Sequence, residues 1–248
     1  MKKISSLIIL LAVLFAVTNI NAQPQMKVHV YGGYNVPLGN LAGNSNWATN
    51  TAPDRYAYMK SGFNAGADFK YFLGKKRNIG LLLNAAYNSY NTGDLSLLGG
   101  SYTTKFTLND VRIGIGAEYD FMPMKKANPF VGIDLTGNFL SGKETFSSGG
   151  TDNTLNSASR FGLAVGAGVD IMISKTFGFV IGAKFDFMNL IGKQDSASIG
   201  TLAANTYGLN DKADTEMGTA VNAMNFMDFQ IYGGVTFAFG QPKKMVKK

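Results

Sequence analysis

Thirteen ionisable side chains stand at alternate positions within glycine- and aromatic-rich segments of this sequence. The acidic ones are Asp68, Asp110, Glu118, Asp120, Asp134, Asp170, Asp186 and Asp228, and the basic ones are Lys27, Lys70, Arg112, Arg160 and Lys184. Charges that are enclosed together must pair, because a lone buried charge is costly. We therefore expect an internal charge network, in which Arg112 and Arg160 each serve several carboxylates. An ion path or gate built from the same residues is the functional alternative.

The rest of the sequence gives little support to metal, cofactor or nucleophile chemistry. There is no cysteine, and a single histidine, His29, with scattered carboxylates shows no metal-ligand spacing. The pairs Gly32-Gly33 and Gly99-Gly100 lack the strand-to-helix context of a phosphate-binding loop. We expect no catalytic residue, no metal ligand and no cofactor, with His29 packed as an interior side chain.

The alternation of these charges with apolar residues predicts β-strands. From Asp110 to Phe121, every second residue is apolar or aromatic, and the intervening residues are charged or glycine. The same period of two is clear at 63–71, 160–171 and 178–187, and weaker at 27–35, 81–88, 131–136 and 230–239. The sequence therefore predicts eight strands, each with one apolar and one polar face.

The composition of the polar faces favours a membrane barrel over a soluble sandwich, whose strands also alternate. All thirteen charges lie on polar faces, which are otherwise rich in Gly and Ala, as a narrow lumen requires. If the apolar faces meet lipid, a slip of one residue would expose basic groups to hydrocarbon at roughly 2 to 4 kcal/mol each near the midplane. Aromatic residues near the strand ends predict two interfacial girdles, with Tyr71, Tyr119, Phe121, Phe177, Phe237 and Phe239 at one rim and Tyr87, Phe139, Phe161 and Phe187 at the other.

The two ends of the chain differ from the body. Lys2 and Lys3 precede an apolar run at 7–17 and a small-residue cleavage site at Ala22, so residues 1–22 are interpreted as a cleaved signal peptide. Residues 23–240 are expected to form one β-barrel domain, and 241–248 a basic periplasmic tail. Six of the lysines behind the net charge of +7 lie in these two end segments, so we expect no nucleic-acid binding.

The predicted connections alternate in length. Short ones lie at 74–78, 123–129 and 174–176, and long ones rich in Gly, Ser, Asn and Thr at 38–60, 91–105, 141–158 and 191–224. Short periplasmic turns and long extracellular loops are typical of outer-membrane barrels, and they place both termini in the periplasm. We predict an all-β, eight-stranded antiparallel transmembrane β-barrel with up-and-down topology. A hairpin hidden in 191–224 would instead make ten strands.

The export signal, the opening Gly32-Gly33-Tyr34-Asn35-Val36-Pro37-Leu38-Gly39 and the last strand resemble the OmpA-like small outer-membrane β-barrel superfamily over residues 23–240. Gly234, Phe237 and Phe239 resemble its barrel-assembly signal, Gly-x-x-aromatic-x-aromatic. The resemblance implies a location in the bacterial outer membrane, contact with outer-membrane lipid and lipopolysaccharide, and handling by the barrel-assembly machinery.

Three functions are compatible with these features. The first, which we expect, is a non-enzymatic barrel that supports the membrane or displays loops; Trp47, Tyr56 and Tyr58 would then contact a surface ligand or the lipid interface. The second is a narrow OmpW-like transport protein for small solutes. The third is a lipid-modifying enzyme. Small-barrel enzymes of this kind use a histidine near the outer leaflet, whereas His29 should lie near the periplasmic end.

Overall fold

The computed structural model describes residues 24–43, 59–74, 76–97, 102–123, 125–147, 151–195, 203–216 and 219–240. The expected signal peptide, the basic tail and the three loop aromatics Trp47, Tyr56 and Tyr58 lie outside the described residues. In the part of the chain that is described, no helix is long and apolar enough to cross a membrane.

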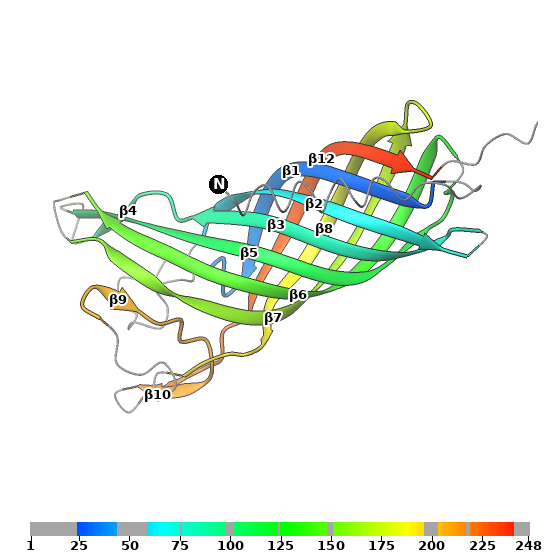
Figure 1. Ribbon diagram of the computed structural model, residues 1–248. Helices are drawn as coiled ribbons and strands as arrows, with labels where there is room; N and C mark the ends of the chain where they lie inside the picture. Colours follow the sequence, from blue (N-terminus) through cyan, green and yellow to red (C-terminus); the bar gives the residue numbers. More distant parts are fainter. Residues whose placement is uncertain are drawn as a thin grey trace, which may run out of the picture.

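Eight long strands form a closed antiparallel barrel (Figure 1). They are β1 (Met26–Gly39), β2 (Ser61–Leu73), β3 (Ile79–Asn91), β5 (Tyr102–Asp120), β6 (Ala127–Phe146), β7 (Asn153–Met172), β8 (Phe177–Ile191) and β12 (Phe226–Phe239). Strand β1 pairs with β12 and β3 pairs with β5, so the sheet closes on itself and its edges disappear. The predicted fold class is confirmed.

The period of two in the sequence becomes an inside and an outside face. On β5, Asp110 and Arg112 are fully buried, whereas Ile113 and Ile115 on the opposite face are 58% and 63% exposed. The other barrel strands repeat this arrangement, so a continuous belt of apolar side chains surrounds the barrel. An exposed apolar surface of this extent calls for contact with hydrocarbon rather than water.

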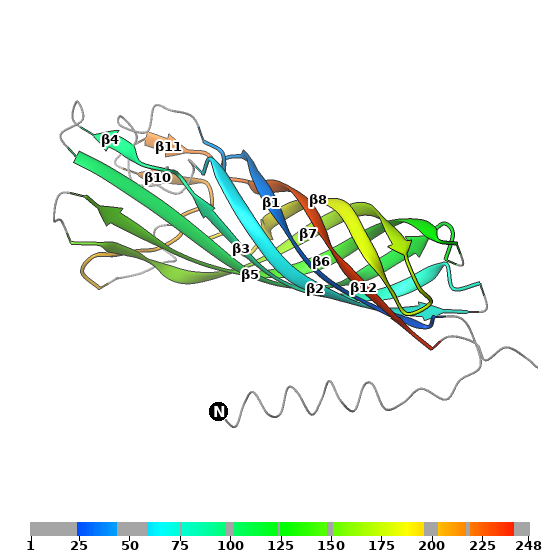
Figure 2. The same cartoon turned by 90° about the horizontal axis from the view of Figure 1, so that it is seen from above.

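The two ends of the barrel are different (Figures 1 and 2). The connections β2–β3, β5–β6 and β7–β8 are short, at residues 74–78, 121–126 and 173–176, and lie at one end, which we call the turn end. Strand β1 starts and β12 finishes there, and the backbone N–H of Gln25 donates to the carbonyl of Phe239 at 2.7 Å. The opposite end, the loop end, carries the longer connections.

Strands β5, β6 and β7 continue beyond their neighbours at the loop end (Figure 1). Pairing of β5 with β6 reaches Thr104 and Phe146, and pairing of β6 with β7 reaches Glu144 and Asn153. The predictions of loops at 91–105 and 141–158 were therefore wrong over much of their length, because strand residues occupy these segments. The β5–β6 turn, at 121–126, also begins before the predicted turn at 123–129. Polar, glycine-containing segments suggest loops. Here β6 is hydrogen-bonded to β5 on one side and to β7 on the other, and this pairing keeps the polar segments extended.

The last long connection contains short strands outside the barrel. β9 (Thr206–Tyr207) pairs in parallel with β7, and β10 (Asp214–Glu216) pairs with β11 (Thr219–Val221) in a separate sheet. β4 (Leu95–Leu97) pairs with β5. The hairpin considered for 191–224 is thus present, but it does not enter the barrel, which keeps eight strands.

Candidate functional site in the barrel interior

The structure places all thirteen predicted charges inside the barrel. None of these residues is more than 5% exposed: Lys27, Asp68, Lys70, Asp110, Arg112, Glu118, Asp120, Asp134, Arg160, Asp170, Lys184, Asp186 and Asp228. They are buried because each occupies an inward position on its strand, as the alternation required. Their partners come from strands on other parts of the wall, so the contacts tie the barrel together across its lumen.

Lys27 bridges two carboxylates near the turn end. Its Nζ lies 2.7 Å from Asp120 Oδ2 on β5 and 2.7 Å from Asp170 Oδ2 on β7. His29, two residues further along β1, is fully buried, with Nε2 2.9 Å from Asp170 Oδ1 and Nδ1 3.7 Å from Asp68 Oδ2. The first strand therefore supplies two nitrogen-bearing side chains to a group of three carboxylates.

The middle of the lumen contains two further ion pairs. Lys70 Nζ donates to Glu118 Oε1 at 2.7 Å and lies 4.1 Å from the centre of the Phe130 ring. Lys184 Nζ lies 3.5 Å from Asp134 Oδ2. The void beside Glu118, Asp134 and Lys184 measures only about 10 Å³, the space of one water molecule at most. Side chains thus fill the middle of the lumen, as the small diameter of an eight-stranded barrel predicts.

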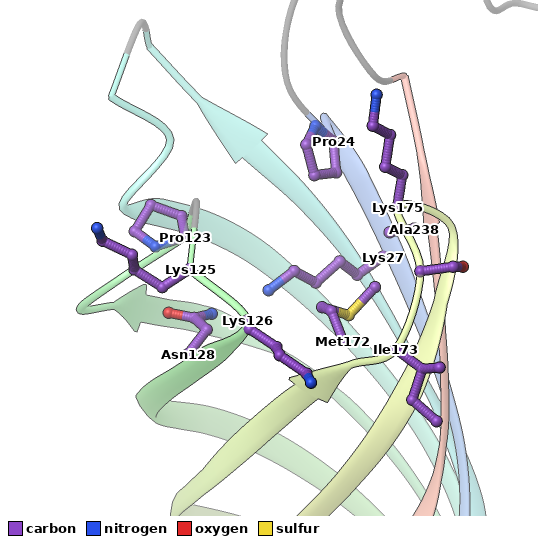
Figure 3. Close-up of a pocket in the computed structure, with 11 residues that line it drawn as sticks. Pro24, Lys27, Pro123, Lys125, Lys126, Asn128, Met172, Ile173, Lys175 and Ala238 are labelled. Carbon is purple, nitrogen blue, oxygen red and sulfur yellow. The ribbon is translucent and has the colours of Figure 1, made fainter.

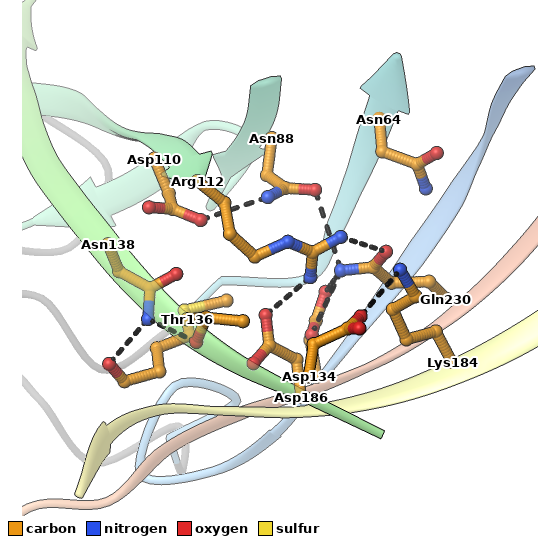
Figure 4. Close-up of polar contacts among 12 residues, drawn as sticks. Asn64, Asn88, Asp110, Arg112, Asp134, Thr136, Asn138, Lys184, Asp186 and Gln230 are labelled. Carbon is orange, nitrogen blue, oxygen red and sulfur yellow. Dashed lines mark hydrogen bonds and ion pairs between the residues drawn. The ribbon is translucent and has the colours of Figure 1, made fainter. Parts of the chain in front are cut away.

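Arg112 lies near Asp110 and Asp186 (Figure 4), and Asp228 is the strand partner of Asp186. Its Nη1 donates to Asp186 Oδ2 at 2.5 Å, and its Nε and Nη2 reach the amide oxygens of Asn84 and Gln230 at 3.2 and 3.4 Å. The other two carboxylates, Asp110 and Asp228, depend on neutral donors. Asn88 Nδ2 donates to Asp110 at 2.9 Å, and the Tyr90 hydroxyl donates to Asp228 at 2.7 Å.

The two arginines do not each join several carboxylates, contrary to the expectation from sequence. Among the described contacts, Arg112 binds the carboxylate of Asp186 and Arg160 binds that of Asp211. Within the described part of the chain, Lys27 is the basic side chain that joins two carboxylates. Amide and hydroxyl groups provide much of the remaining connection, and these residues were not part of the predicted network.

Sequence reasoning missed Asp211, which lies between β9 and β10 in the last long connection. Arg160 Nε and Nη2 donate to its two oxygens at 2.9 and 2.8 Å, and both residues are at most 2% exposed. Asn189 Nδ2 adds a donor to the same carboxylate at 2.8 Å. No periodicity marks a loop residue that folds back into a lumen, so the sequence offered no signal for this contact.

A second unpredicted feature is an apolar section at the loop end of the lumen, which we call the apolar plug. It consists of Leu41, Met59, Tyr90, Phe106, Leu108, Leu140, Leu155, Ala158, Met188, Leu209, Met224 and Phe226. Inward positions on six strands contribute to it, and Leu41, Met59, Leu209 and Met224 come from the connections. The apolar plug and the ionic section below it together occupy the lumen from the loop end toward the turn end.

His29 is enclosed by other side chains in this arrangement. It is 0% exposed, and its ring centre lies 5.9 Å from that of Phe130. Within the described residues, no group of three or more His, Asp or Glu side chains is arranged to hold a metal ion. The interior therefore has the features of a packed, paired core.

The outer surface carries aromatic side chains near both ends. Tyr119 and Phe121 lie edge to face with ring centres 5.1 Å apart, and the rings of Phe177 and Phe237 lie 5.6 Å apart at the same end. Phe161 at the loop end is 62% exposed. Aromatic rings at these positions fit the two boundaries between hydrocarbon and water.

The predicted assembly-signal residues all lie on β12. Phe237 projects outward and is 38% exposed, Phe239 pairs with Met26, and Gly234 faces inward opposite Tyr31. A β-carbon at Gly234 would overlap the backbone of Val30 and Tyr31. The glycine therefore has a packing role where β12 meets β1.

Known proteins include a matching family and several similar solved structures. The family model for the outer membrane protein beta-barrel domain matches residues 21–192. Among solved structures, the chain is similar to Neisserial surface protein A, with 17% identity, 87% of this chain and 97% of that chain covered and a TM-score of 0.46. It is also similar to the outer membrane protein OprG from Pseudomonas aeruginosa, with 14% identity, coverage of 89% and 99% and a TM-score of 0.47. A major outer membrane protein from Thermus thermophilus gives 11% identity, coverage of 86% and 99% and a TM-score of 0.49. The comparison with curated proteins found no match.

Proposed function

Because this chain belongs to the outer membrane protein beta-barrel domain family, we propose that it is a non-enzymatic barrel that supports the bacterial outer membrane and displays its loops at the cell surface. The observation that carries this proposal is the filled lumen. The apolar plug occupies the loop end, and paired charges occupy the section below it. A barrel whose described lumen is occupied by side chains contributes its outer surface and its loops.

We place the turn end in the periplasm and the loop end outside the cell. The support is that strand β1 begins and strand β12 ends at the turn end, beside the three short turns. Short turns on the periplasmic side and longer loops outside are the rule for this architecture. In this orientation the extended β5–β6–β7 sheet and the β10–β11 hairpin project toward surface ligands.

The proposed partners follow from the same orientation. The apolar belt would contact the lipid chains of both leaflets and of lipopolysaccharide, and the aromatic girdles the two interfaces. Gly234, Phe237 and Phe239 would be presented to the barrel-assembly machinery on the last strand. The long loops are the surface on which an external ligand would bind.

Narrow transport of small solutes is the second candidate, and the apolar plug is the observation that favours it. A lumen section lined by Leu, Met and Phe side chains could accept a small apolar solute if its loop residues Leu209 and Met224 moved. The ionic section below would still oppose passage through the axis, so such a solute would have to leave sideways into the membrane.

Planar-bilayer recording distinguishes the two candidates. The refolded full chain is first tested for heat-modifiable migration on a gel, which reports the folded barrel. We expect no reproducible single-channel current from the wild type. A stable selective current, or flux of a small apolar solute into vesicles that carry the protein, would contradict the closed barrel and favour transport. A variant with Leu209→Gly and Met224→Gly tests whether the plug is the barrier, and Leu135→Gly on the lipid face is its control.

An enzymatic role would depend on the buried His29. We expect that incubation of the folded barrel with phospholipid and lipopolysaccharide leaves both lipids unchanged by mass spectrometry. A product that forms with the wild type and disappears with a folded His29→Gln variant would contradict the non-enzymatic proposal.

A further inference from the structure

Every short turn at the turn end carries basic residues and no acidic ones. The described basic residues are Lys76 and the largely buried Arg77 between β2 and β3, Lys125 and Lys126 between β5 and β6, and Lys175 between β7 and β8. Acidic residues near this end, Asp120 and Asp170, are fully buried inside the barrel and contact Lys27. The rim of the turn end therefore carries exposed lysines from all three turns, which we call the basic ring.

A depression of about 420 Å³ opens within this ring (Figure 3). Its walls include Lys125 and Lys126 from one turn and Lys175 from another, together with the apolar side chains of Met172 and Ile173. Lys27 lies deeper, only 3% exposed, and is already matched by its two aspartates. Among the described residues that line the depression, none is acidic. The ammonium group at the base of the depression is thus already held by two carboxylates, and the basic side chains at the rim are the ones that an incoming ligand meets first.

Exposed apolar side chains adjoin the lysines in the same turns. Phe121 and Met122, just before Lys125, are each 52% exposed, and Ile173, just before Lys175, is 61% exposed. Such side chains favour the hydrocarbon boundary, and a lysine a few residues away then reaches the level of the lipid phosphates. The order of residues in these turns therefore places apolar side chains at the hydrocarbon boundary and lysine ammonium groups at the adjacent level of the lipid phosphates.

We propose that the turn-end depression binds the headgroup of an anionic phospholipid. The phosphate lies against Lys125, Lys126 and Lys175, and the acyl chains pass over Ile173 into the bilayer. The volume is within the range of small-molecule sites, roughly 300 to 1,000 Å³. A free anion would contact the lysines but would leave the exposed apolar side chains of the rim facing water, which favours a lipid. The inference rests on the proposed function, because it requires a barrel embedded in a membrane.

Native mass spectrometry of the full chain tests the site. The protein is refolded in detergent micelles, its barrel is verified by heat-modifiable migration, and phosphatidylglycerol or phosphatidylcholine with the same acyl chains is added. We expect preferential retention of phosphatidylglycerol. The combined variant Lys125→Gln, Lys126→Gln, Lys175→Gln should lose at least about tenfold in that retention, since each lysine near an anionic surface contributes roughly fivefold. Added salt should weaken retention by the wild type.

The matched control removes three exposed lysines at the loop end, Lys105→Gln, Lys143→Gln and Lys212→Gln, and should keep the preference. Equal retention of the two lipids, or an equal loss in both triple variants, would overturn the inference while leaving the folded barrel intact. Displacement of the lipid by inorganic phosphate at the same concentration would also overturn it, in favour of a simple anion site. Failure of the wild type to show heat-modifiable migration would instead overturn the proposed function, and the inference with it.

Discussion

Arg160 on the barrel wall holds both carboxylate oxygens of Asp211, a residue of the last long loop, at 2.9 and 2.8 Å. Arg160 Nη2 also donates to the carbonyl of Leu209 at 3.1 Å, and Leu209 belongs to the apolar plug. The ion pair and the plug therefore fix the same segment of the loop over the lumen. A surface loop is held in one position by a contact inside the barrel.

Replacing Asp211 with Ala should lower the free energy of unfolding by about 3 to 5 kcal/mol, because it leaves the guanidinium of Arg160 buried without its carboxylate. Urea unfolding in lipid vesicles, read by heat-modifiable migration, measures the loss. Asp195→Ala, which breaks the more exposed pair with Lys212, is the control and should change stability by less than about 1 kcal/mol. Equal stability of the two variants would contradict the role of the buried pair.

Replacing Arg112 with Ala should also cost about 3 to 5 kcal/mol, because Asp186 loses its only described cationic partner. Asp110 lies nearby (Figure 4), and Asp228 is the strand partner of Asp186. The temperature at which the compact gel band disappears should fall. The double variant Arg112→Gln, Asp186→Asn removes both members of the pair and should recover part of the loss. An unchanged transition temperature for Arg112→Ala would refute the contribution of this arginine.

Two leucines on β6 test the difference between the plug and the lipid face. Leu140 is fully buried in the apolar plug, whereas Leu135 is 67% exposed on the belt. Leu140→Ala leaves a cavity and should destabilise the barrel by about 2 to 5 kcal/mol. Leu135→Ala should cost less, because lipid chains can fill the space that the side chain leaves. A larger loss for Leu135→Ala in vesicles would argue against the plug as a packed core.

Two positions on the outer face of β5 test the placement of the membrane. Ile113 is 58% exposed and pairs with Ala85, in the middle of β3, whereas Thr107 pairs with Asn91 at the end of that strand. Ile113→Arg should cost about 2 to 4 kcal/mol and Thr107→Arg at most about 1 kcal/mol, because a charge is most costly at the bilayer midplane. Urea titrations in vesicles compare the two. Similar free-energy costs for the two variants would contradict the placement of Ile113 near the bilayer midplane.

Phe237 separates folding from cellular assembly. Its ring is partly exposed, and its centre lies 5.6 Å from that of the Phe177 ring. Phe237→Ala should therefore change stability in detergent only modestly. If the last strand carries the assembly signal, the same variant should sharply reduce the amount of folded barrel in the outer membrane of cells. Phe179→Ala, an outward aromatic on β8, is the control. Normal cellular amounts of folded Phe237→Ala would remove this residue from the signal.

The strand count and the inward positions of the charges could be predicted from the sequence because they depend on local alternation. Arg112 follows Val111 and precedes Ile113, and a strand must send such neighbours to opposite faces whatever surrounds it. Closure into a barrel then makes one face the inside. The same reasoning wrongly predicted a loop at Gly142 and Lys143, which lie in β6. A polar segment forms a strand when neighbouring strands on both sides bond to its backbone, and the presence of those neighbours cannot be inferred from the segment itself.

The sequence alone thus determined which residues face inward, because strand geometry converts a period of two into two faces. Only the tertiary structure decided which residues meet. Lys27 pairs with Asp170, 143 positions away, and Asp211 returns from a loop to Arg160. It also decided that Leu108 and Leu140, on the same faces as the charges, gather into a plug. Partners across a lumen are set by barrel closure and strand register, which join distant parts of the chain and leave no mark on the spacing of residues within one strand.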